Sequence, residues 1–354
     1  MLLSELTAPA PRLALVGLAK NTGKTVALTA LLSELAAAGR TVGVTSVGRD
    51  GEEHDVIDSR IEKPRVWLRA GSIVASTDVL LRASALPHEV LERTGARTPL
   101  GTVLIARLRG EGTLEVAGPS TAAGVRAACD AMLGYGAEQV LIDGAIDRRA
   151  ASSPDVADGL VISTGAVLSE DIDEVVSRTR DAVELVRLAR VAHEPRARML
   201  AIGPHSALLG EHGEHAQLPP RFALTASAAD ISAALDDAPQ ARWMLVAGAL
   251  PEHFVRELAH LLHRRARELT LVLADSTKAF LSEHGPGWYA GQGLQIEVLE
   301  PISLRALTVN PIAPRSHSFD SAQLRELLHA AIGDIAIFDV MSPDYRGSRP
   351  AAIA

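Results

Sequence analysis

Short apolar runs and helical segments alternate along the first half of the chain. Continuous apolar runs, the pattern of strands covered on both faces, are predicted as strands at 13–16, 41–47, 139–145 and 158–166. Segments with the apolar spacing of helices lie between or after them, at 25–38, 118–135 and 170–192. This alternation is typical of α/β proteins, and we predict a doubly wound, mostly parallel sheet.

The second half continues the alternation less clearly. Strands are predicted at 199–202, 222–225, 243–247, 270–274, 295–299, 304–309 and 335–340, and helices at 251–269 and 321–332. A helical piece is predicted at 87–94, and a hairpin or two adjacent strands at 102–108 and 113–117. The polar break at 193–196 divides the chain into an N-terminal domain, 1–195, and a C-terminal α/β portion, 196–354. Whether 304–354 returns to the first sheet is left open.

A glycine loop joins the first predicted strand to the first predicted helix. Its sequence runs from Gly17 to Lys24-Thr25, and five residues separate Gly17 from Gly23. Strand, glycine loop, Gly-Lys-Thr and helix form the context of a phosphate-binding loop, in which backbone N–H groups and the helix N-terminus surround the phosphates. The predicted nucleotide-binding residues are Gly17, Lys20, Asn21, Thr22, Gly23, Lys24, Thr25 and Val26.

Carboxylates follow two of the predicted strands. An apolar strand ending in Asp143 is the Walker B pattern, whose carboxylate meets the shell of a Mg²⁺ ion or orients water. An acidic turn after the strand at 41–47 contains Asp50 and Asp55. Ligands of a doubly wound sheet bind beyond the carboxyl ends of its strands. We therefore predict that Lys24 and Asp143 are catalytic, and that Thr25, Asp50, Asp55 and Asp143 hold Mg²⁺; a solvated turn is the alternative for the two acids of that turn.

Composition narrows the function classes. A net charge of −8 and only 3% aromatic residues disfavour nucleic-acid binding, which needs a basic surface and stacking platforms. No apolar run is long enough for a membrane span, and the N-terminus lacks the basic start of a secretory signal, so a cytoplasmic location is expected. The chain has four lysines, and two of them, Lys20 and Lys24, lie in the glycine loop. Retention of lysine in an arginine-rich chain favours a phosphate-binding role.

The five-residue spacing of the loop resembles that of dethiobiotin synthetase and its relatives in the dimerising, metabolic branch of P-loop proteins. These synthetases carry a carboxylate-Gly-Ala element where this chain has Asp143-Gly-Ala, usually with Glu. They also have a strand that ends in Asn, with Pro close behind, and this Asn reads the adenine edge. The resemblance implies that Asn310 contacts the adenine of ATP, whereas an Asn-Pro turn is the alternative. For Lys20 the sequence leaves two alternatives open. Its side chain contacts phosphate, either in its own site or across a homodimer interface, or it faces solvent.

Four segments in this order resemble the P-loop subunit of the lysine 5,6-aminomutase reactivase, over nearly the whole chain. They are the loop at 17–25 and the segments 45–52, 142–148 and 308–311. The resemblance implies an ATPase that helps restore a cobalamin- and pyridoxal-phosphate-dependent aminomutase after its cofactor is inactivated. It also implies a second subunit, similar to the mismatch-repair ATPases of the MutS type.

Two rival functions differ in kind from a reactivase. A ligase similar to dethiobiotin synthetase needs a basic residue just after the second strand, where this chain has Ser46, Val47 and then Arg49. The other rival is a binding module in which nucleotide stabilises an assembly interface without hydrolysis. The guanine-reading motif Asn-Lys-x-Asp does not occur in the sequence, which favours ATP over GTP.

Overall fold

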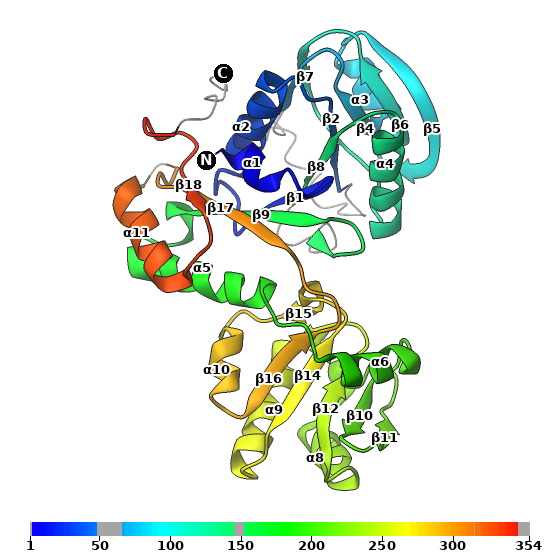
Figure 1. Ribbon diagram of the computed structural model, residues 1–354, viewed down its shortest axis with the longest axis vertical. Helices are drawn as coiled ribbons and strands as arrows, with labels where there is room; N and C mark the ends of the chain where they lie inside the picture. The colour runs from blue at the N-terminus through cyan, green and yellow to red at the C-terminus, as the bar shows by residue number, and fades with distance from the viewer. Residues whose placement is uncertain (1, 48–65, 145–151, 315, 346–354) are drawn as a thin grey trace. The chain divides into compact units, whose positions relative to one another are not determined.

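The computed structural model describes residues 2–47, 66–144, 152–314 and 316–345, which divide into two compact units (Figure 1). Unit 1 comprises Met1–Thr179 and Ser303–Ala354, and unit 2 comprises Arg180–Ile302. The first division between the units falls after Thr179, inside helix α5 (Ile172–Val186), and not after residue 195 as predicted. The division also assigns residues 303–354 to the first unit, which is the return to the first sheet that the sequence left open.

Unit 1 is built on a nine-stranded sheet. From edge to edge its strands are β18 (Ile337–Phe338), β17 (Leu304–Asn310), β9 (Gly159–Gly165), β1 (Arg12–Gly17), β8 (Gln139–Asp143), β2 (Val42–Ser46), β4 (Ile73–Thr77), β6 (Gly101–Leu108) and β5 (His88–Thr98). All neighbours from β18 to β4 are parallel, and β6 and β5 are added in antiparallel pairing. An α/β fold with a large, mostly parallel sheet is therefore confirmed.

Helices cover both faces of this sheet. Leu13 and Leu15 of β1 share a core with Leu28 of α2 (Lys24–Ala37), so α2 covers the face on which these strand residues lie. Gly43 lies on the opposite face, where a Cβ atom would be 3.3 Å from the Sδ of Met132 in α4 (Ala122–Gly134). The central strands β1, β2, β8 and β9 are buried almost throughout, so their residues are apolar without alternation, as the sequence pattern predicted.

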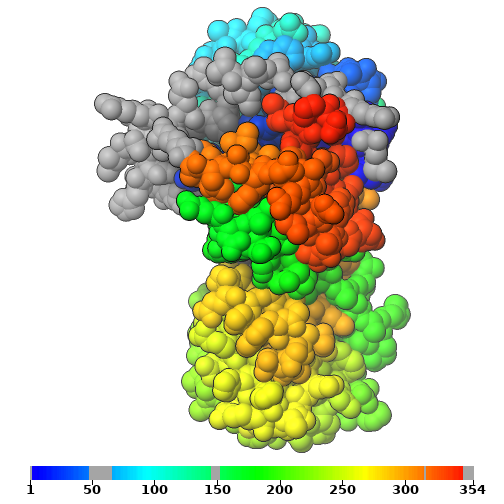
Figure 2. Space-filling model, turned by 90° about the vertical axis from the view of Figure 1, so that its left-hand side faces the viewer, coloured from blue at the N-terminus to red at the C-terminus, as the bar shows by residue number. Residues whose placement is uncertain are grey.

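The C-terminal segment of the chain completes the sheet after unit 2. β17 pairs with β9, and the hydroxyl groups of Thr308 and Ser163 are 2.7 Å apart across the two strands. Helix α11 (Ser321–Ile332) follows, and its N-cap Asp320 accepts a hydrogen bond from the backbone N–H of Gln323 at 2.8 Å. Figure 2 shows this segment, in orange and red, on the surface of unit 1. The described residues of this unit also form α1 (Leu3–Thr7), α3 (Asp78–Ala83) and the 3-10 turn η3 (Ala166–Leu168).

The structure differs from the predictions for the region 87–117 in two respects. The predicted helix at 87–94 is the first part of strand β5, because pairing with β6 outweighs the helical preference of its Glu and Leu residues. The two strands predicted at 102–108 and 113–117 are present as β6 and β7 (Gly112–Leu114), but among the described strands they do not pair as a hairpin, since β6 pairs with β4 and β5. β7 instead pairs with β3 (Val66–Leu68).

Unit 2 contains a smaller sheet with its own core. In order its strands are β11 (His215–Gln217), β10 (Ala207–Gly210), β12 (Ala241–Leu245), β14 (Leu269–Leu273) and β16 (Leu294–Val298). β12, β14 and β16 are parallel, and β10 is antiparallel to both of its neighbours. The other elements are α6 (His193–Ile202), α7 (Phe222–Thr225), α8 (Ala228–Asp237), β13 (Leu250–Pro251), α9 (Glu252–Arg264), η4 (Ser276–Lys278), β15 (Ala279–Phe280) and α10 (Pro286–Ala290).

The predicted strands at 199–202 and 222–225 are helical, in α6 and α7. Short apolar runs cannot distinguish a strand from the buried side of a helix, and Met199 and Phe222 are such buried helix positions. The predicted break at 193–196 is instead the start of α6. Pro195 lies in the first turn of that helix, where its missing N–H removes no intrahelical hydrogen bond.

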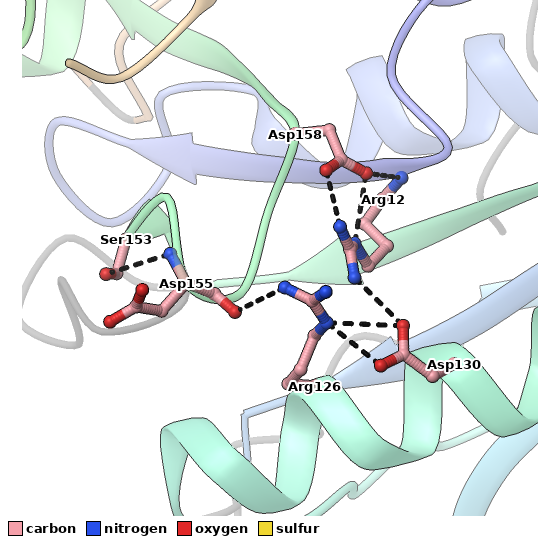
Figure 3. Close-up of polar contacts among 6 residues, drawn as sticks. All are labelled: Arg12, Arg126, Asp130, Ser153, Asp155 and Asp158. Carbon is pink, nitrogen blue, oxygen red and sulfur yellow. Dashed lines mark hydrogen bonds and ion pairs between the residues drawn. The ribbon is translucent and has the colours of Figure 1, made fainter. Parts of the chain in front are cut away.

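An arginine–carboxylate network joins three segments at the amino end of β1 (Figure 3). The Arg12 guanidinium donates to Asp158 at 3.0 Å through Nε and to Asp130 at 2.9 Å through Nη1, and Arg126 binds both Asp130 and the backbone oxygen of Asp155. Hydrogen bonding to Asp158 raises the pKa of Arg12. Burial alone would raise the pKa of Asp158, but the bonds from Arg12 outweigh it and lower that pKa. The network fixes the chain just before β9.

Cys129 is fully buried in α4, and burial raises the pKa of its thiol to about 12. We predict that iodoacetamide at pH 8 leaves Cys129 unmodified in the folded protein and modifies it in urea, because the thiolate is the reactive form. Mass spectrometry of the intact chain measures the reaction. Rapid modification of the folded chain would contradict the packing of α4 against the sheet.

Among the described residues, none of the helices has the length and apolar content that a membrane crossing requires.

Candidate functional site

The described members of the predicted site in unit 1 come together at the carboxyl ends of the parallel strands of its sheet. β1 ends at Gly17, β8 at Asp143 and β17 at Asn310, and all three strands run parallel. β1 lies between β8 and β9, so the glycine loop leaves the sheet between the ends of these two strands. This is the position at which doubly wound sheets bind ligands.

The glycine loop has a conformation that its residues determine. Asn21 and Gly23 have positive φ angles of 66° and 86°, which glycine and asparagine adopt most readily. The buried Thr22 hydroxyl donates to the backbone oxygen of Ala19 at 3.0 Å and so closes the loop on itself. A Cβ atom on Gly17 would lie 2.5 Å from the Thr22 Oγ1 atom. The loop therefore requires glycine at position 17.

Helix α2 begins directly after the loop and has an open N-terminus. Its N-cap is Gly23, which has no side chain to accept a hydrogen bond, and its first turn contains no acid. The first backbone bond of the helix runs from the N–H of Ala27 to the oxygen of Gly23 at 2.9 Å. The backbone N–H groups of Lys24, Thr25 and Val26 thus have no intrahelical acceptor. With the positive end of the helix dipole, they form a local environment that favours an anion.

Lys24 and Asp143 form an ion pair at this helix N-terminus. The Lys24 Nζ atom is 2.6 Å from the Asp143 Oδ1 atom, and each side chain is 21% exposed. The Oδ1 atom is buried, and within the described ranges it accepts no hydrogen bond. Charge attraction therefore holds the pair together. Both side chains are partly exposed, so an incoming anion can reach Lys24 and an incoming cation can reach Asp143, which separates the two residues.

The residues present fit a magnesium ion in part. Carboxylate and hydroxyl oxygens are suitable Mg²⁺ ligands, and Asp143 offers a buried carboxylate oxygen, which becomes available once its ion pair with Lys24 opens. The Thr25 hydroxyl, in the first turn of α2, makes no hydrogen bond within the described part of the chain. The other two predicted ligands, Asp50 and Asp55, lie outside the described residues, so the ligand set described here consists of Thr25 and Asp143.

Two further predicted loop residues differ in what they offer. The Lys20 side chain is exposed and forms no ion pair with any described residue. The Val26 side chain packs against the core below the loop, so that its backbone N–H is the part available to a ligand. The polar residues Asp147 and Arg148, which follow Asp143 in the sequence, lie outside the described residues.

Asn310 meets the glycine loop from the far end of the sequence. Its side-chain Nδ2 donates to the backbone oxygen of Asn21 at 2.9 Å. A Cβ atom on Gly23 would lie 3.1 Å from the Asn310 Cβ. The structure thus brings together Gly17, Asn21, Thr22, Gly23, Lys24, Thr25, Val26, Asp143 and Asn310.

Sequence reasoning missed a polar cluster at the ends of β2 and β4. The Ser46 hydroxyl donates to the backbone oxygen of Val116 at 2.8 Å, and the Ser76 Oγ accepts from the N–H of Ala117 at 3.1 Å. A Cβ atom on Gly118 would lie 2.2 Å from the backbone carbonyl oxygen of Ser46, so the chain passes very close to β2 at Gly118. A serine near the end of each apolar strand was the available signal. Among the described residues, the cluster thus places the uncharged segment 116–118 beside the ends of β2 and β4.

An open hollow of about 420 Å³ lies in unit 2, lined by residues that include Arg198, His205 and His215. We place the candidate site at the glycine loop of unit 1 instead, because a helix N-terminus with free backbone N–H groups binds phosphates. Comparisons with protein-family models, with curated proteins and with solved structures found no significant match to this chain.

Proposed function

We propose that this chain is a Mg²⁺-dependent P-loop nucleoside triphosphatase of the dethiobiotin synthetase-like branch, with ATP as its preferred substrate. The observation that carries the proposal is the Lys24–Asp143 ion pair of 2.6 Å beside an uncapped helix N-terminus and a glycine loop. A metal–triphosphate offers a partner to each member of this pair. The lysine contacts the phosphates, and the carboxylate contacts the metal.

The chemistry follows from these two charges. When the triphosphate enters, Lys24 leaves Asp143 and contacts the β- and γ-phosphate oxygens, while the backbone N–H groups of Lys24, Thr25 and Val26 donate hydrogen bonds to phosphate oxygens. Asp143 and the Thr25 hydroxyl would hold Mg²⁺, which when bound would supply positive charge beside the phosphates. Lys24 stabilises the charge that develops on the phosphates in the transition state, and this contribution accelerates hydrolysis.

The use of the hydrolysis energy rests on the resemblance to the lysine 5,6-aminomutase reactivase. We propose that the chain works with a MutS-like second subunit on a cobalamin- and pyridoxal-phosphate-dependent aminomutase. In this role the nucleotide needs different contacts in its triphosphate and diphosphate states, since a ligand shifts a conformational equilibrium only through differential binding. The sequence supports this role over a ligase, because Ser46 and Val47 stand where the ligase resemblance needs a basic residue.

ATP turnover by the full chain separates the three functions. We expect turnover to require Mg²⁺ and to rise when the mutase and the second subunit are added. Turnover that appears only with a small diamino or carboxylic acid would replace the reactivase proposal with the ligase. Binding without turnover under every condition would replace it with the binding module.

A further inference from the structure

The sequence contains two asparagines, Asn21 and Asn310, and the structure places them in contact. Asn21 lies in the glycine loop, and Asn310 is the last residue of β17, 289 positions later. The contact runs from the side chain of Asn310 to the backbone of Asn21, so it depends on the amide at position 310 alone. It directly joins the glycine loop to the C-terminal segment of unit 1.

Both ends of the Asn310 amide have partners within the protein. The Nδ2 donates to the Asn21 carbonyl oxygen at 2.9 Å, and the Oδ1 accepts from the N–H of Ile312 at 3.2 Å. A carbonyl can only accept and an N–H can only donate, so these partners determine which way the amide points. One N–H of the Nδ2 and one lone pair of the Oδ1 are therefore engaged inside the protein, and together these two bonds fix the plane of the amide.

The surroundings of Asn310 hold it in place. A Cβ atom on Gly165, the residue of β9 that pairs with Asn310, would lie 2.0 Å from the Asn310 backbone oxygen. On the other side, Gly23 approaches its Cβ in a conformation with φ of 86°. The side chain thus lies between the end of β9 and the turn that begins α2. Its hydrogen bond acts on Asn21, the non-glycine residue that holds a positive φ angle in the loop.

We propose that Asn310 is a positioning residue that holds the glycine loop in its phosphate-binding conformation, and that the site selects the polyphosphate rather than the base through this side chain. The proposal rests on the proposed function. It assigns Asn310 a role that differs from the adenine contact implied by the resemblance. The contact orders the glycine loop that binds the phosphates. Its loss therefore lowers the affinity for every ligand that carries the same phosphates.

The test compares three ligands, ATP, GTP and inorganic tripolyphosphate, each with Mg²⁺, by isothermal titration calorimetry on the full chain. For Asn310→Ala we expect about tenfold weaker binding of all three, the equivalent of one neutral hydrogen bond at the upper end of its range. For Asn310→Asp the loss is larger, because a carboxylate repels both the Asn21 carbonyl and the phosphates, and the ratio of ATP to GTP affinity stays unchanged.

A base-reading Asn310 gives a different pattern, which would overturn the proposal. In that case Asn310→Ala weakens ATP alone, tripolyphosphate binds as before, and Asn310→Asp shifts the preference toward GTP, since a carboxylate accepts from the guanine N–H groups. Gln323→Ala, which removes an exposed amide from α11, is the matched control and should leave all three affinities unchanged. Thermal unfolding of each variant shows whether it is folded. A wild-type chain that binds none of the three ligands would contradict the proposed function itself, a result distinct from either pattern.

Discussion

Lys24→Ala is expected to lower Mg²⁺-dependent ATP turnover by about a hundredfold or more. The substitution removes the cation that leaves Asp143 to meet the phosphates, and losing one preorganised charge-stabilising group has an effect of this order. Steady-state phosphate release by the full chain measures it. Lys278→Ala is the matched control because this lysine belongs to unit 2, and it should turn over ATP at the wild-type rate.

Asp143→Asn separates the two halves of the ion pair. Turnover should fall as far as in Lys24→Ala, because the carboxylate that holds Mg²⁺ is lost. Binding of ATP without Mg²⁺ should become tighter than in the wild type, since Lys24 no longer has to leave a counter-charge and the phosphates no longer meet a carboxylate. Wild-type turnover in both variants, or weaker metal-free binding in Asp143→Asn, would contradict the assignment of this pair.

Glu252→Ala is expected to destabilise unit 2 by about 3 kcal/mol, the order observed when several buried donors lose a charged acceptor. Glu252 begins α9, is 8% exposed and accepts from the backbone N–H groups of Ser282 at 2.8 Å and Glu283 at 2.9 Å. It also accepts from the Tyr289 hydroxyl at 3.0 Å. Urea unfolding followed by tryptophan fluorescence measures the loss. Glu257→Ala, an exposed acid on the same helix, should change stability little.

The same residue predicts a pH dependence. Burial alone would raise the pKa of Glu252, but the hydrogen bonds from Ser282, Glu283 and His284 outweigh it and lower that pKa. Its contribution to stability is therefore complete above the usual pKa of a glutamate, about 4.3, and is lost as the pH falls through the lower pKa of the folded state. Stability measured from pH 7 to pH 3 should fall more steeply in the wild type than in Glu252→Ala. Parallel curves would contradict the role of the carboxylate.

The core of the site could be predicted from sequence because its signals are local. A glycine loop between an apolar strand and a helix has few structural solutions, and Asp143 ends an apolar strand in a fold that places such ends at one edge. The helix at 321–332 was also predicted with the observed bounds. Here, propensity, patterning and capping agree with the fold.

Long-range features could not be predicted in the same way. That β17 returns beside β9 depends on pairing between residues about 145 positions apart, for which local patterning has no signal. The use of the Asn310 amide follows from that return and not from the Asn-Pro dipeptide. The apolar run that contains Met199 predicts a strand although it is helical, because burial on a helix and burial in a sheet need the same residues.

Calorimetric titration of the full chain with MgATP, for the wild type and Lys24→Ala, tests the central claim most directly. We predict one ATP bound per wild-type chain, with affinity that depends on Mg²⁺, and at least about a hundredfold weaker binding by Lys24→Ala. Absence of binding by the wild type, or equal affinity in both proteins, would contradict the assignment of the glycine loop as a nucleotide site.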